Sequence, residues 1–124
     1  MVRIQREIIA VGAFSMYESL LQSELEWSRP FDELRDRLEE QEHHDLSSRF
    51  EDYRLAINVL KHGTGLSHTR LLERREELEF AIKEPSTFFY EGDITEGQSL
   101  IDVDEKFVQR CAELIKETRN KIDK

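Results

Sequence analysis

Apolar residues recur at intervals of three and four along most of the chain, which is the spacing of an amphipathic α-helix. The first such stretch predicts a helix from about Arg3 to Glu26. Its predicted core positions are Ile4, Ile8, Val11, Phe14, Leu21 and Leu25, with Tyr17 beside them. The segment Trp27–Pro30 breaks the periodicity, so the helix is expected to end there.

Four further helices are predicted from their apolar stripes and from capping residues. Their expected N-caps are Ser28, Ser47 or Ser48, Ser67 and Asp104. The second, third and fourth helices of the chain are expected to end at about Glu42, Gly63 and Pro85. Pro30 stands in the first turn of the second helix, and Glu51 is placed for a capping box in the third. Leu71, Leu72, Leu78 and Ile82 supply the expected core stripe of the fourth helix.

Residues 86–103 have a different pattern, because aromatic and β-branched residues flank two glycines there. This composition fits a short hairpin or an irregular flap that packs on the helices. The predicted fold is therefore all-α: an antiparallel bundle of four or five helices with one short irregular or β-hairpin excursion near 86–103. A chain of 124 residues forms one such domain, over 1–124.

The chain carries a net charge of −9, which opposes binding of nucleic acid or an anionic membrane by the molecule as a whole. Between Arg54 and Arg75, however, five basic residues stand against Glu73 alone. This positive segment either marks an anion-binding surface or reflects ordinary variation along helix surfaces. The single cysteine, Cys111, lies in a helical pattern and is expected to be a buried apolar residue. No membrane-spanning or secretory segment is recognised, so a cytoplasmic location is expected.

One row of polar side chains has the residue types for chemistry. Arg54, Asn58 and His62 are spaced four apart, so they lie on one side of the third helix, and His62 falls in its last turn. Histidine can transfer a proton near neutral pH, and arginine can hold a phosphate, so the row suits metal-free RNA cleavage. The alternative is structural: Arg54 pairs with Glu51, Asn58 is solvated, and His62 caps the helix end.

Other basic side chains near this row are candidates for contacts to RNA phosphates: Lys61, His68, Arg70 and Arg74. The arginines among them can instead pair with glutamates of their own helix. His43, His44 and Asp45 are adjacent, a spacing that rarely brings ligands to one ion, so no metal site is expected. No cofactor motif is recognised in the chain.

The segment Asn58-Val-Leu-Lys-His62-Gly63, following a charged amphipathic helix, resembles the HEPN superfamily of helical-bundle proteins. The segment Ala13–Glu18 is similar to a helix of many such proteins, and together these stretches cover about a third of the chain. The resemblance implies a metal-independent ribonuclease of toxin–antitoxin, abortive-infection or RNA-processing systems, with two sites facing each other across a dimer. Active members place four to six residues between arginine and histidine, whereas seven separate Arg54 from His62, and Ile57 occupies the usual arginine position. A non-cleaving member therefore also fits.

Two functions follow as hypotheses. A HEPN-like RNA-binding protein or ribonuclease predicts a cleft lined by the polar row and by Arg70 or Arg74. A non-catalytic interaction module, of dimerisation, immunity or antitoxin type, predicts that a carboxylate neutralises Arg54 and that His62 faces open solvent. A homodimer is expected in either case, because small residues at Ala10, Gly12 and Ala13 allow a second helix to approach closely. RNA and a cognate antitoxin or other partner protein are the further partners considered.

Overall fold

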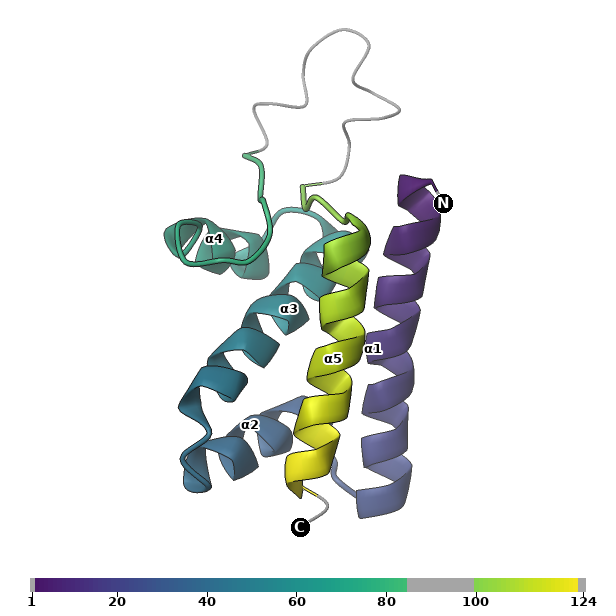
Figure 1. Cartoon of the computed structure of the whole chain (residues 1–124), viewed down its shortest axis with the longest axis vertical. Helices are drawn as coiled ribbons and strands as arrows, with labels where there is room; N and C mark the ends of the chain where they lie inside the picture. Colours follow the sequence, from purple (N-terminus) through teal and green to yellow (C-terminus); the bar gives the residue numbers. More distant parts are fainter. Residues whose placement is uncertain (1, 85–99, 123–124) are drawn as a thin grey trace, which may run out of the picture.

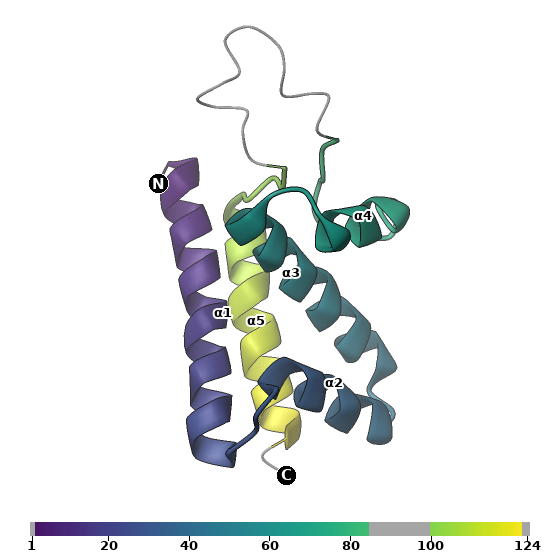
Figure 2. The same ribbon diagram turned by 180° about the vertical axis from the view of Figure 1, so that it is seen from behind.

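The computed structural model describes residues 2–84 and 100–122. Within these ranges the chain forms helices α1 (Arg3–Leu25), α2 (Pro30–Glu40), α3 (His44–His62), α4 (Leu66–Glu73) and α5 (Glu105–Ile122). The predicted all-α bundle is thus confirmed. α3 runs antiparallel to α1, whereas α5 runs parallel to α1 and lies beside it (Figure 1). α2 closes the lower end of the bundle, and α4 packs on α3 alone among the described helices (Figure 2).

The core is aromatic where α1, α2 and α3 meet. The ring of Phe14 lies 5.2 Å from that of Phe50 and 5.9 Å from that of Phe31, measured between centroids. A second aromatic group joins Tyr53, Phe80 and Phe107, at centroid distances between 4.9 and 5.2 Å. Both groups pack in tilted, edge-on or offset arrangements of the kind that aromatic rings favour. These contacts hold α1, α2, α3 and α5 together.

The buried face of α1 differs from the predicted one. Phe14, Tyr17 and Leu21 are buried as expected, together with Ala10. Three predicted core residues are instead exposed: Ile4 (63%), Ile8 (65%) and Leu25 (40%). The physical reason is that the side of α1 that packs on its neighbours carries Ala10, Phe14 and Tyr17, where the Tyr17 hydroxyl lies 2.9 Å from the Thr118 hydroxyl on α5. The predicted helix is therefore correct, but its buried side is only partly the predicted one.

The predicted N-caps are correct at one helix and shifted at three. The Asp104 carboxylate accepts a hydrogen bond of 2.8 Å from the Phe107 backbone N–H, so Asp104 caps α5 as expected. The predicted caps at Ser28, at Ser47 or Ser48 and at Ser67 are wrong, because α2, α3 and α4 follow Arg29, His43 and Gly65 instead. Two of these serines, Ser48 and Ser67, instead contact side chains distant in sequence. Ser47 is buried, and Ser67 lies 3.5 Å from the Asn58 amide nitrogen.

The fourth helix is shorter than predicted: α4 ends at Glu73 instead of continuing to Pro85. Turns and bends follow, and the segment 78–84 packs on both α3 and α5, where the Phe80 ring contacts Tyr53 and Phe107. Leu78, Phe80 and Ile82 alternate along it, which is the period of an extended chain, and they pack against the core. Ile82 pairs antiparallel with Ile101, through backbone hydrogen bonds of 2.8 and 3.0 Å. Most of the predicted excursion, residues 86–99, lies outside the described residues.

Candidate functional site

The polar row lies on the second half of α3 and ends at the corner between α3 and α4. The helix stops at Gly63, whose φ of 77° belongs to the left-handed region that glycine adopts without strain. The Gly63 N–H donates to the Val59 carbonyl at 2.7 Å and so closes the last turn. His62 is therefore held at an exposed helix end, as the sequence predicts.

Arg54 is neutralised by carboxylates of the same chain. Its Nη1 lies 2.9 Å from Oδ1 of Asp32 on α2 and 3.4 Å from Oε1 of Glu51, one turn earlier on α3. Its guanidinium carbon stands 5.7 Å from the centre of the Phe31 ring. The hydrogen bond from Arg54 holds the pKa of the Asp32 carboxyl below its ordinary value of 3.8, which marks a favourable pair. The contact joins α2 to α3.

This pair makes stability depend on pH in acid. Because the folded-state pKa of Asp32 is lowered, the pair stabilises the protein above the ordinary value of 3.8, and this contribution is lost as the pH falls toward the lowered pKa. In Asp32→Asn we expect a weaker loss of unfolding free energy on acidification than in the wild type. Urea unfolding between about pH 7 and about pH 2.5 measures both slopes.

Asp36→Asn is the matched control for this experiment, since Asp36 lies on the exposed side of the same helix, with 67% of its side chain accessible. Its dependence on pH should follow the wild type. Equal acid slopes for Asp32→Asn and the wild type would show that the Asp32–Arg54 pair contributes nothing to stability.

Asn58 stands between two small hollows and links the members of the row. One hollow, of about 80 Å³, contains Asn58, Arg54 and Lys61 together with Glu18 of α1. The other, of about 310 Å³, is an open depression at the helix corner that contains Asn58, His62 and Ser67. The structure thus places Arg54 and His62 in neighbouring hollows, so neither hollow contains all three residues of the row. Lys61 and His62 are both exposed to solvent.

The remaining basic candidates are distributed over different surroundings. His68 is buried at 3% exposure, and its Nε2 lies 2.8 Å from the Lys83 carbonyl oxygen, which ties α4 to the extended segment. Arg74 pairs with Asp52 through two contacts, of 2.9 and 3.0 Å. Arg70 is exposed, and no hydrogen bond or ion pair joins it to the parts of the chain that the structure describes. Of the four, Lys61 and Arg70 are the ones open to a ligand.

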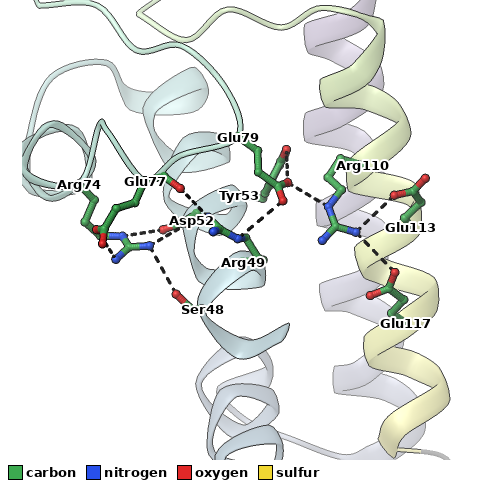
Figure 3. A network of polar contacts seen from close by, with 10 residues as sticks. All are labelled: Ser48, Arg49, Asp52, Tyr53, Arg74, Glu77, Glu79, Arg110, Glu113 and Glu117. Carbon is green, nitrogen blue, oxygen red and sulfur yellow. Dashed lines mark hydrogen bonds and ion pairs between the residues drawn. The ribbon is translucent and has the colours of Figure 1, made fainter. Parts of the chain in front are cut away.

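A network of ion pairs, which sequence reasoning missed, fixes the segment after α4 (Figure 3). Its centre is Asp52, 2% exposed, which contacts both Arg74 and Arg49. Glu79 continues the network, because its carboxylate accepts hydrogen bonds from the Tyr53 hydroxyl at 3.1 Å and from Arg110 at 3.0 Å. Burial and Glu79 raise the pKa of Tyr53, so this hydroxyl remains a donor. The available signal was the acidic Asp52 on the apolar side of a helical pattern.

The cysteine and the possible metal ligands of the described residues can be placed in the same way. Cys111 is buried at 1% exposure, and burial raises the pKa of its thiol to about 12, so little reactive thiolate forms at neutral pH. Within 2–84 and 100–122, no cluster of three or more His, Cys, Asp or Glu side chains could hold a metal ion. In the same ranges no helix has the length and apolar character needed to cross a membrane.

The fold and this site define an all-α protein with a polar row at a helix corner. Comparison with known proteins finds no family, no curated protein and no solved structure that matches this chain.

Proposed function

We propose that this chain is a non-catalytic helical module for protein–protein interaction. One observation carries the proposal: the outward side of α1 exposes several large apolar side chains. They are Val2, Ile8, Ile9, Met16 and Leu20, with exposed fractions between 41% and 67%. Monomeric soluble proteins rarely leave an apolar surface of this size open, and such surfaces commonly mark protein contacts.

The surroundings of Arg54 support a non-catalytic function. A catalytic arginine must offer its N–H groups to a phosphate, whereas Arg54 is already engaged by Asp32 and Glu51. Both carboxylates would also repel a phosphate that approached the guanidinium. His62 faces open solvent in a shallow depression, and this arrangement does not hold an RNA backbone in one position.

Two kinds of protein partner would bury the face of α1. A second copy of the chain would form a homodimer, and a different protein of antitoxin or immunity type would form a hetero-complex. In both cases apolar burial supplies the free energy of association, at roughly 25 cal/mol per Å² before the costs of association.

A second candidate function, HEPN-like RNA binding or metal-independent RNA cleavage, is favoured by the charge at the α3–α4 corner. No acidic residue occurs between Leu55 and Leu72, and this stretch carries Lys61, His62 and Arg70 on exposed positions. A local positive surface of this kind can contact phosphates although the whole chain is acidic. In this function His62 would act as the general acid or base.

An RNA cleavage assay in EDTA distinguishes the two functions. For an interaction module we expect no RNA cleavage above background, and the wild type and His62→Ala should give the same result. The measurement is the disappearance of a mixed RNA substrate on a denaturing gel, with the fold of each protein checked by circular dichroism.

His43→Ala serves as the control substitution, because His43 lies at the opposite end of α3 from His62. Cleavage by the wild type and by His43→Ala that is lost in His62→Ala would contradict the interaction module and establish the RNA function.

A further inference from the structure

The exposed face of α1 has a definite pattern, and we infer that it binds a second copy of this chain in an antiparallel helix pair. This inference rests on the proposed function and names the partner of the same surface. We define the α1 seam as the positions that recur every seven residues along its centre: Val2, Ile9, Met16 and Ser23, with Gln5, Gly12 and Ser19 between them. A repeat of seven keeps one stripe of a helix facing a neighbouring helix.

The seam lies on the outer side of the bundle. α1 is an edge helix in both views, and its opposite side packs on α5 and α3 (Figures 1 and 2). Met16 is 67% exposed and Val2 60% exposed, while Ile8 (65%) and Leu20 (41%) border the seam on either side. These apolar positions therefore lie on one stripe of α1, while the exposed Ile4 (63%) and Leu25 (40%) lie outside it.

The area of this stripe is adequate for a dimer. α1 has 23 residues and is about 35 Å long, at 1.5 Å per residue. Stable interfaces bury about 800 Å² on each partner. The five large apolar side chains, at exposed fractions of 41–67%, supply part of this area, and the flanks of two contacting helices would supply the rest.

The charge pattern favours a second copy over a different protein. The chain carries −9, so an unlike partner of complementary charge would be recognised through acidic side chains. Neither the seam nor its borders Ile8 and Leu20 contain a charged residue. The surface complementary to an uncharged apolar stripe is another such stripe, and a second α1 offers one without bringing like charges into the contact.

The sizes of the seam residues are self-complementary in the antiparallel direction. A two-fold axis at the level of Phe14 places Gly12 opposite Met16 of the second copy, and Ile9 opposite Ser19 of the second copy. Met16 and Ile9 then each face a small residue, which allows the helices to approach closely along the middle of the seam. Gly12 is costly within a helix, and a Cβ added there would meet nothing within 4 Å in the chain itself. A neighbouring helix packed against Gly12 would explain why this position has no side chain.

Two polar groups of the seam already have partners within the chain. The Ser23 hydroxyl donates to the Leu20 carbonyl oxygen at 3.3 Å, and the Gln5 side-chain oxygen accepts from the Val2 N–H at 3.1 Å. Burying these groups against a second helix therefore leaves those hydrogen bonds in place. Antiparallel packing also sets opposite helix dipoles side by side, which is favourable.

Sedimentation velocity over a range of concentrations tests the inference. We expect the wild type to be a dimer, and Met16→Glu to weaken its association by at least about 100-fold, because each dimer would bury two carboxylates in the seam. Ile4→Glu is the matched control: Ile4 is 63% exposed on α1 but lies outside the seam and its borders. This variant should associate like the wild type.

A size exchange tests the antiparallel register. Gly12→Met should weaken the dimer by placing two large side chains opposite each other, and Gly12→Met combined with Met16→Ala should restore it. Gly12 and Met16 are exposed and make no contacts that hold the core, so each variant should fold. Circular dichroism of each variant checks this.

A monomeric wild type at every soluble concentration would overturn the inference, as would a dimer equally sensitive to Met16→Glu and Ile4→Glu. The proposed function fails separately, through cleavage of RNA that depends on His62. A monomer that does not cleave RNA would therefore reject the second copy as partner and leave an interaction module that binds a different protein.

Discussion

Replacing Phe14 with alanine is expected to lower the free energy of unfolding by about 3–5 kcal/mol, the usual effect of deleting a buried aromatic ring. Phe14 is 1% exposed, and its ring contacts Phe31 of α2 and Phe50 of α3. The deletion therefore leaves a cavity where three helices meet, and most of the lost contacts cannot be replaced by relaxation. Urea unfolding followed by circular dichroism measures the change.

Leu66→Ala is the control for this prediction, because Leu66 is 66% exposed at the start of α4. Its replacement should change the unfolding free energy by less than about 0.5 kcal/mol. If the Phe14→Ala and Leu66→Ala changes were equal, the aromatic group would not be the centre of the core.

The second large effect is expected at Arg74, whose replacement by alanine should cost about 2–4 kcal/mol. Asp52 is 2% exposed, and among the described residues its charge would then keep only the contact of 3.3 Å from Arg49. Removing one partner of a buried pair is costly, since the remaining charge stays out of water with too few donors. The change should also loosen the segment after α4, which the network holds against α3 and α5.

Two further variants separate this mechanism from a general effect of losing an arginine. Arg75→Ala removes the neighbouring arginine, whose pair with Glu84 is exposed, and should cost at most about 1 kcal/mol. The double variant Asp52→Asn with Arg74→Ala should be more stable than Arg74→Ala alone, because it contains no unpaired buried charge. A double variant as unstable as the sum of both single changes would contradict the buried-charge explanation.

Part of the candidate site followed from the sequence. The spacing of Arg54, Asn58 and His62 placed them on one helix, and Gly63 correctly marked its end. The main partner of Arg54 was not predictable in this way, since Asp32 is 22 residues earlier on α2. The same holds for Arg74 and Asp52. Pairs distant in sequence depend on how helices are arranged, and no local period encodes that arrangement.

The sequence by itself determined the helical class, the approximate extent of α1 and α3, the cap at Asp104 that begins α5, and the burial of Cys111. These features depend on residues within a few turns of each other, where spacing, capping and apolar periodicity act directly.

Only the tertiary structure decided which side of α1 is buried, where α4 ends and which carboxylate holds Arg54. Apolar residues occur on more than one side of α1, so periodicity alone did not select the side that packs on α5 and α3. α4 ends at Glu73 although its pattern continues, because Arg74 pairs with Asp52 and the next apolar residues, Leu78 and Phe80, pack on the core from outside a helix. The physical reason is the same in each case: contacts between helices outweigh the small local preferences of a helix for its own continuation.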